Sequence, residues 1–404
     1  MSDIDSDSER QTPAPSTQPD PGTPEAADAP FDELLSPLHE LHVEAGASFT
    51  DFAGWQMPVR YSSDLAEHHA VRTGGGLFDL SHMGEILVVG PEAAQALDYA
   101  LAGKLSAIVE GQAKYTLLLA RDGGILDDLV VYRTGKDRYL VVANASNREL
   151  VARELRDRCS IFDCLVEDES DEIALIAMQG PIAEEVLRNV EGFDVPLVDG
   201  RGLDGLKYYR AIPADFRGHN VLVARTGYTG EDGFEFYLGP VAAAELWVAL
   251  LETGGGSGLV PAGLAARDTL RLEAGMPLYG HELDADTFPE QAGLAKVVAL
   301  SKEGDFVGRA AIEEGPSSDA RVLVGLTAEG KRAGRAGYSI VLPDSAHVVG
   351  VVTSGALSPT LGVPVALAYV DPDYAAVGTL LHLDVRGTRV PASVVALPFY
   401  SRKK

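Results

Sequence analysis

The chain has 404 residues, of which 46% are hydrophobic, and its formal net charge is −27. This length predicts two or three domains rather than one core, and the hydrophobic content is typical of a globular protein. The acidic charge argues against a nucleic-acid surface, which needs clustered Lys and Arg. No run of about eighteen apolar residues, as a membrane span requires, occurs.

The basic residues are nine Lys and 24 Arg. Acid-rich, Lys-poor surfaces suit a salty cytoplasm, where ions screen self-repulsion, so we interpret the composition as that of a halophile. A merely acidic protein with an acidic tail is the alternative. The spacing of Cys159 and Cys164 fits neither a redox pair nor a zinc half-site, so reduced thiols are expected. The start, MSDIDSDSER, lacks the regions of a signal peptide, and we expect a cytoplasmic protein.

The first predicted element is a disordered acidic tail over residues 1–30, because its composition offers few apolar side chains to bury. Three helices are then expected to begin at Pro91, Pro181 and Pro240. Gly-rich sequence, GGGSG, follows the last of these helices and predicts its C-terminal stop.

A further helix is predicted over LVARELRDR, with Ser146 and Glu149 as a capping box at its start. The strands expected between these helices are β-branched, aromatic or leucine-rich. From about Arg321 the pattern changes to short strands with turn signals, which predicts a small all-β domain. The stretch Glu313–Ala320 is the expected linker, and together these features predict an α+β fold with a C-terminal β domain.

Acidic and phenolic side chains share one face of the expected strand in GGILDDLVVYR (Gly123–Arg133). Because side chains alternate along a strand, Asp128 and Tyr132 point to one side and Asp127 to the other. An acid and a phenol on one face can contact the same ligand. The alternative is that both aspartates cap a turn after the Gly pair.

A second carboxylate lies in RTGYTGEDGFEFY (Arg225–Tyr237). Glu235 is held in a strand between Phe234 and Phe236, which point to the opposite face. A carboxylate there can accept two N–H bonds from a planar heterocycle, and Tyr228 could stack on a ring. The alternative is an ordinary solvated strand face.

Two cations are one helical turn apart in ARDTLRLEAG (Ala266–Gly275). Arg267 and Arg271 would repel each other unless carboxylates or an anionic ligand lie opposite. A structural ion-pair network is the alternative. The nine histidines form no metal-binding pattern; His82 in LSHMGE could contact a ligand, although a core or capping role is favoured.

These segments resemble the glycine cleavage T-protein family, the aminomethyltransferases, over nearly all of the chain after the tail. The matching stretches, in the family's order, are PLHELHVEAGASFTDFAGWQMPVRYSS, GLFDLSHMGE, GGILDDLVVYR, LVVANASN, RTGYTGEDGFE, GLAARDTLRLEAGMPLYGHEL, VTSGALSPTLG and the terminal LPFY. The resemblance implies three domains arranged as a cloverleaf around a central folate-binding hole. It divides the chain into the tail, a folate-binding region of two interleaved α+β subdomains (31–312) and a C-terminal β-barrel (321–404).

The resemblance also implies an activity. The family moves the aminomethyl group carried on lipoylated H protein to tetrahydrofolate, which forms 5,10-methylenetetrahydrofolate and releases ammonia. Partners would be H protein, met transiently, and functionally the P and L proteins, with no nucleic acid, membrane or metal. Asp128 would be the catalytic carboxylate and Glu235 would bind the pteridine edge. The other implied folate-binding residues are Met83, Leu87, Tyr115, Tyr132, Asn144, Tyr228 and Arg267.

Other members of the same superfamily remain alternatives at this point. A tetrahydrofolate-dependent demethylase would share the folate pocket and differ in its methylated donor. The iron–sulfur assembly branch carries a KGC-aromatic-x-GQE motif, whereas this chain reads SKEGDFVGRAAI (Ser301–Ile312) without Cys. A non-catalytic scaffold would be expected to lack Asp128 or Glu235. Met276 stands where an aromatic residue is expected, so that pocket wall would differ.

Overall fold

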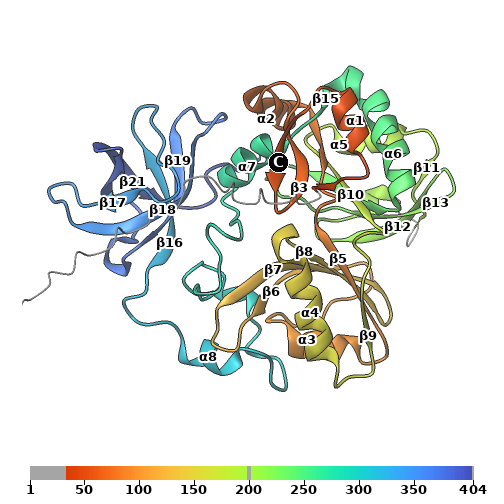
Figure 1. Ribbon diagram of the computed structural model, residues 1–404, viewed down its shortest axis with the longest axis horizontal. Helices are drawn as coiled ribbons and strands as arrows, with labels where there is room; N and C mark the ends of the chain where they lie inside the picture. The colour runs from red at the N-terminus through yellow and green to blue at the C-terminus, as the bar shows by residue number, and fades with distance from the viewer. Residues whose placement is uncertain (1–32, 198–201, 403–404) are drawn as a thin grey trace, which may run out of the picture. The chain divides into compact units, whose positions relative to one another are not determined.

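The computed structural model describes residues 33–197 and 202–402, and Leu34–Lys404 form one compact unit (Figure 1). The tail predicted over residues 1–30 lies outside the described residues. Two large sheets and a closed barrel organise this unit. A small sheet also contains β1 (Leu34–Leu35), β3 (Trp55–Arg60) and β2 (Ser48–Phe52), in that order, with α1 (His39–Glu44) between β1 and β2 in the chain.

A seven-stranded sheet supplies one wall of the molecule's interior. Its order is β11 (Phe193–Asp194), β12 (Ala211–Phe216), β13 (His219–Ala224), β14 (Gly233–Leu238), β10 (Ala174–Gln179), β4 (Gly75–Asp79) and β15 (Leu259–Pro261). Helices α5 (Ala183–Asn189) and α6 (Pro240–Gly254) cover one face, where Phe234 and Phe236 pack with Leu246 and Trp247. Proline occupies the first turn of α6, as its fixed φ allows.

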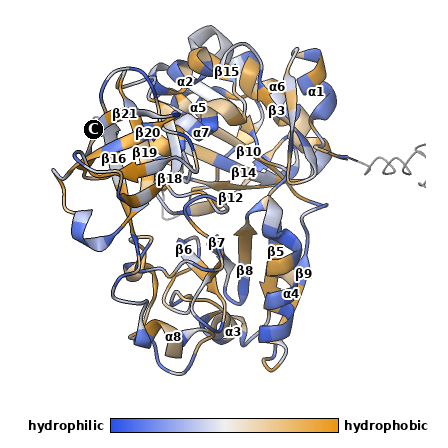
Figure 2. Ribbon diagram, turned by 60° about the vertical axis from the view of Figure 1, so that its left-hand side comes forward, coloured by the Kyte–Doolittle hydropathy of each residue, from blue (hydrophilic) through white to orange (hydrophobic). Residues whose placement is uncertain are grey.

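A five-stranded sheet supplies the facing wall. Its order is β6 (Ala113–Leu119), β7 (Ile125–Gly135), β8 (Arg138–Ala143), β5 (Gly84–Val89) and β9 (Leu165–Asp168). Helices α3 (Ala93–Ala100) and α4 (Arg148–Cys159) pack on its outer face, against side chains such as Ile86 and Val131. In Figure 2 the strands of the sheets carry much of the orange, apolar colour, while blue gathers on loops and helices.

The inner faces of the two sheets meet in a shared apolar cluster. Tyr132, Leu140 and Val142 of the five-stranded sheet pack there with Leu175 and Tyr237 of the seven-stranded sheet. Alternation along each strand therefore sends one set of side chains to a helix layer and the other set to the space between the sheets.

The C-terminal part is a closed six-stranded barrel. Its strand order is β16 (Val322–Ala328), β19 (Pro364–Val370), β18 (Val348–Leu357), β17 (Ser339–Val341), β20 (Leu380–Val385) and β21 (Thr388–Val395). Closure leaves no unpaired sheet edge. Helix α8 (Arg309–Glu314) precedes it. The predicted α+β fold with a C-terminal all-β barrel is confirmed.

Helix α7 (Leu264–Glu273) lies between the barrel and strand β3 of the small sheet (Figure 1). At its C-terminal end Glu273 is fully buried and accepts hydrogen bonds from Arg72 of α2 (Asp64–Thr73) and from Ser358 and Thr360 of the barrel part. The guanidinium of Arg72 also lies 4.0 Å from the ring centre of Tyr400. One charged network thus fastens α2, α7 and the barrel together.

The predicted capping box of Ser146 and Glu149 is wrong. Helix α4 begins at Arg148, after a 3₁₀ turn over Ala145–Asn147, and the N-cap is Asn147, whose side chain makes no capping hydrogen bond. The amide of Asn147 donates instead to Asp127 of β7, at 2.8 Å. A tertiary acceptor therefore replaces the local cap. Across residues 33–197 and 202–402, none of the helices is long and apolar enough to cross a membrane.

Candidate functional site

A cavity of about 360 Å³ lies between the two sheets and is closed on a third side by α7 and the segment after it. Its wall includes seven of the nine residues that the sequence predicts for the site. They are Met83, Tyr115, Asp128, Asn144, Tyr228, Glu235 and Arg267. Residues that come from distant parts of the sequence therefore converge on one hollow.

The Asp128 carboxylate stands on β7, where alternation turns it inward. It accepts hydrogen bonds from the Tyr115 hydroxyl at 3.0 Å and from the Asn144 amide at 2.8 Å. Burial raises the pKa of Asp128, and the two hydrogen bonds oppose that rise. Burial also raises the pKa of Tyr115 well above its ordinary value. This end of the cavity presents a desolvated acid held by two neutral donors.

The Glu235 carboxylate stands on β14. One oxygen, Oε2, accepts hydrogen bonds from three hydroxyls: those of Thr226, Tyr132 (3.2 Å) and Tyr237 (3.4 Å). Among the described residues no donor reaches the other oxygen, Oε1. A carboxylate held in this way can accept an N–H group of a ligand in the cavity.

The cation predicted on α7 faces the same space. Arg267 lies with its guanidinium carbon 4.8 Å from the ring centre of Tyr228, whose hydroxyl donates to the Pro277 carbonyl. Its Nη1 atom is buried and has no hydrogen-bond partner within the described parts of the chain, and burial lowers the pKa of Arg267. Arg271 is different because Asp268 and Glu282 neutralise it, at 2.7 and 3.0 Å. Of these two arginines, only Arg267 therefore has a buried N–H group left to bind an anion.

Two of the predicted site residues lie outside the wall. Tyr132 is buried behind Glu235 and contacts it through its hydroxyl. Leu87 lies in β5, opposite Leu140 of β8 and Glu167 of β9, and the structure does not bring it to the cavity. Strand β8 lies between β7 and β5, and its Val142 is an apolar residue of the cavity wall.

His82 is a wall residue for which the sequence favoured a core or capping role. It is 2% exposed, and its Nδ1 atom has no partner within the described residues. Burial lowers the pKa of His82 to about 4, and nearby Arg267 lowers it while Asp79 raises it, so the ring is neutral at pH 7. Tyr209, Tyr237 and other wall residues were missed because each carries only an ordinary strand or loop pattern. The other missed wall residues include Phe52, Thr226, Leu278 and Tyr279, whereas Met276, which the sequence analysis assigned to a pocket wall, also lines this cavity.

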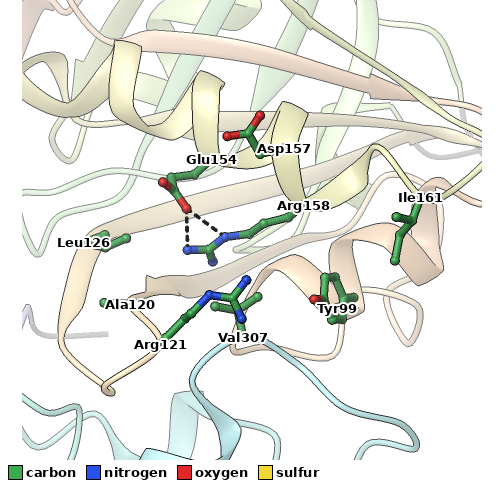
Figure 3. A pocket seen from close by; sticks show the side chains of 9 residues that line it. All are labelled: Tyr99, Ala120, Arg121, Leu126, Glu154, Asp157, Arg158, Ile161 and Val307. Atoms are coloured by element: carbon green, nitrogen blue, oxygen red, sulfur yellow. Dashed lines mark hydrogen bonds and ion pairs between the residues drawn. The ribbon is translucent and has the colours of Figure 1, made fainter.

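A second hollow, of about 450 Å³, lies between α4, Tyr99 of α3 and the turn that joins β6 to β7, and contains none of the predicted residues (Figure 3). Its buried Arg158 is already bound to Glu154 at 2.8 Å and to the carbonyls of Ala100 and Leu119. The guanidinium of Arg121 lies beside that of Arg158 in Figure 3. Because the buried charge is satisfied internally, we assign the chemistry to the cavity between the sheets.

In the part of the chain that the structure describes, no group of three or more His, Cys, Asp or Glu is arranged to hold a metal ion.

Comparison with known proteins identifies the family to which this chain is similar. The model of the GCVT N-terminal domain matches residues 38–302, and that of the glycine cleavage T-protein C-terminal barrel domain matches residues 321–401. A protein of Cutibacterium acnes named aminomethyltransferase is 58% identical, over 91% of this chain and 98% of its own length. One of Streptomyces avermitilis with the same name is 54% identical, over 91% and 97%.

A solved structure is also similar along the whole described chain. The glycine cleavage system aminomethyltransferase T from Bartonella henselae superposes with a TM-score of 0.82 at 37% identity, covering 91% of this chain and 98% of that one. The relatives come from diverse bacteria, so they do not support the halophilic origin inferred from the charge.

Proposed function

Because the chain belongs to the glycine cleavage T-protein family, the aminomethyltransferases, we propose that its substrates are tetrahydrofolate and the aminomethyl group carried on lipoylated H protein. The products are 5,10-methylenetetrahydrofolate, ammonia and H protein with its lipoyl arm in the dithiol form. The observation that carries the proposal is the cavity in which Asp128, Glu235 and Arg267 converge.

Asp128 is the proposed catalytic carboxylate. Loss of ammonia from the aminomethyl group leaves a cationic carbon on the lipoyl sulfur. This carbon becomes iminium-like when a folate nitrogen bonds to it and the sulfur leaves as a thiol, and a fixed carboxylate beside it stabilises the positive charge. The Tyr115 and Asn144 hydrogen bonds hold the carboxylate in one place. The same fixed geometry favours the approach of the folate nitrogens N5 and N10 to the carbon.

Glu235 is proposed to bind the pteridine ring. Its Oε1 atom can accept from the amino and ring N–H edge, because the three hydroxyls bind the other oxygen. Tyr132 contributes by holding Glu235. The rest of the proposed folate site is formed by Met83, Tyr115, Asn144, Tyr228 and Arg267. Arg267, with its unpartnered Nη1, would meet a carboxylate of the ligand or balance the buried acids.

We extend the proposal to the setting of the reaction. H protein would be met transiently, with the P and L proteins completing the sequence, in the cytoplasm. The matches of the two family models, which end at 302 and begin at 321, support a division between a folate-binding region and the barrel. Membrane and nucleic-acid partners are not part of the proposal.

The test is an assay with tetrahydrofolate and H protein carrying the aminomethyl intermediate, in which ammonia and methylenetetrahydrofolate are measured. Asp128→Asn should lower kcat by several orders of magnitude and leave folate binding in place, because only the charge is removed. Asp373→Asn, an exposed acid of the barrel part, is the matched control and should keep full turnover. Folate binding by the wild type without product would contradict the proposal and direct the search to small methylated donors.

A further inference from the structure

The side-chain amide of Asn144 lies between two carboxylates. Its Nδ2 atom is 2.8 Å from Oδ1 of Asp127 and 2.8 Å from Oδ1 of Asp128. The backbone N–H of Asn144 also donates to Oδ2 of Asp127, at 3.1 Å. Asp127 itself is fully buried on the opposite side of β7 from the cavity. The two neighbouring aspartates are thus joined through one amide group.

This arrangement determines which way the amide faces. An amide carries two N–H donors on nitrogen and only acceptor lone pairs on oxygen. With a carboxylate oxygen on each side, both donors are used, and a turned amide would set its oxygen against an acceptor. The Oδ1 atom of Asn144, which no donor reaches among the described residues, is therefore left for the cavity whose wall Asn144 forms.

We propose that Asp127 is a positioning residue for the reaction: it orients the Asn144 amide so that the Asn144 Oδ1 accepts an N–H group of the bound substrate beside Asp128. Of the two aspartates, Asp127 holds Asn144 more firmly, since it binds both the backbone and the side chain of Asn144. Its Oδ1 also accepts from Asn147 at 2.8 Å. The inference deepens the proposed function and rests on it.

Asp127→Asn is the sharpest variant, because an asparagine cannot satisfy this site in either orientation. Asp127 receives donors on both of its oxygens, so the new NH₂ group must face a donor whichever way it turns. Asn147→Ala is the matched control. It removes one donor to the same carboxylate on the side away from the cavity and leaves both Asn144 contacts intact.

The experiment measures kcat, the KM for tetrahydrofolate and Tm for the full-length wild type and for both variants. We expect Asp127→Asn to lower kcat at least about 10-fold and Asn147→Ala to keep kcat within about twofold, although both lower Tm by loosening the same turn. In a double-mutant cycle, Asp127→Asn should cost no further kcat once Asn144 is Ala, since it acts through that residue. Asp127→Ser enters the same cycle if Asp127→Asn does not fold.

Three results would overturn the positioning role: wild-type kcat in Asp127→Asn, an equal loss in Asn147→Ala, or independent losses in the cycle. These failures are distinct from failure of the proposed function. A wild-type protein that yields no ammonia and no methylenetetrahydrofolate contradicts the proposed function, whatever the variants do. An active wild type with an equally active Asp127→Asn contradicts only the role of Asp127.

Discussion

The two oxygens of the Glu235 carboxylate meet different surroundings. The hydroxyls of Tyr132, Thr226 and Tyr237 converge on Oε2, so the side chain is anchored without using Oε1. An anchored acceptor loses little conformational freedom when a ligand binds. Binding affinity is therefore expected to depend on this residue more than on the apolar wall.

Glu235→Ala should weaken tetrahydrofolate binding by about 2–4 kcal/mol, as expected for a charge-assisted contact that uses two N–H groups. Calorimetric titration with tetrahydrofolate gives the dissociation constant directly. The control is Glu167→Ala, an exposed glutamate of strand β9, which should bind as the wild type does. An unchanged dissociation constant in Glu235→Ala would rule out the ring-edge contact.

Glu85 is a buried acid that takes no part in the cavity. It is 0% exposed in β5, and neither of its carboxylate oxygens has a hydrogen-bond partner within the described residues. Burial raises its pKa well above the ordinary 4.5, so the folded protein favours the neutral acid. The stability that this group contributes is fully present below pH 4.5 and is lost as pH rises through the folded pKa.

Glu85→Met should therefore stabilise the protein, by about 1–3 kcal/mol, and more at pH 8 than at pH 5. Methionine is close in size and carries no unsatisfied oxygens. Denaturant unfolding at the two pH values measures the free energy of unfolding. The exposed Glu167→Met serves as the comparison and should show little change at either pH. A Glu85→Met protein less stable than the wild type at pH 8 would contradict the argument.

At the scale of single residues, the sequence predicts the face of a strand on which each side chain lies. The opposite faces of Asp127 and Asp128, and the inward face of Glu235, follow from a period of two. The unpartnered Nδ1 of His82 and the bridging amide of Asn144 do not, because they depend on which strands become neighbours. The position of Leu87 outside the cavity wall has the same origin.

Helix α7 serves two sides of the molecule. Arg267 and Arg271, one turn apart, face the cavity, whereas Thr269 and Glu273, also one turn apart, face α2 and the barrel part. His68 of α2 contacts Thr269 at 2.8 Å and Glu273 at 3.2 Å. The helical period of 3.6 residues places the two pairs on different faces.

Glu273→Gln should cost about 3–5 kcal/mol of unfolding free energy, because it leaves Arg72 buried without its full countercharge. Burial alone would raise the pKa of Glu273, but hydrogen bonds from His68, Ser358 and Thr360 lower this pKa to about 2. This stabilisation is present above pH 4.5 and is lost as pH falls through the folded pKa.

Thermal unfolding between pH 7 and pH 3 measures both effects of Glu273→Gln. The loss of Tm relative to the wild type should shrink toward pH 3, where the wild-type carboxylate begins to take up protons. Glu329→Gln, at an exposed glutamate after β16, should match the wild type throughout. A constant difference between Glu273→Gln and the wild type at every pH would show that charge is not the cause.

At the scale of elements, the helices marked by proline lie close to their predicted positions, and the barrel begins with β16 at Val322, next to the predicted start of the β domain near Arg321. Their signals are local, since they depend on the fixed φ of proline and on turn residues. The start of α4 was misjudged because Asn147 finds a carboxylate on β7, which no local pattern can anticipate. The order of strands within each sheet is non-local in the same sense.

The whole molecule carries a net charge of −27. Charges of one sign on a compact surface repel each other, and salt weakens that repulsion over distances of about 10 Å at 0.1 M. Raising NaCl from about 0.05 to 0.5 M should therefore raise Tm by roughly a few degrees. A differential scanning measurement across this range gives the dependence.

The control for the salt effect is a variant with fewer surface acids. Glu40, Glu44 and Glu191 are exposed, and replacing all three by Gln should flatten the rise of Tm with salt. Equal slopes for this variant and the wild type would show that surface repulsion is not what the salt relieves.

Because α7 contacts both the cavity and the barrel, the chain can be divided between α7 and the barrel into two fragments that depend on each other. Residues 316–320 connect helix α8 to the barrel. Across this connection, Arg271 of α7 donates a hydrogen bond to Ser354 of the barrel at 2.8 Å, and Glu273 of α7 accepts hydrogen bonds from Ser358 and Thr360. Severing that segment would give two pieces, each holding half of these pairs. Such fragments would regain turnover only on meeting, so the enzyme split at this point would act as a reporter of the encounter of whatever proteins are fused to its halves.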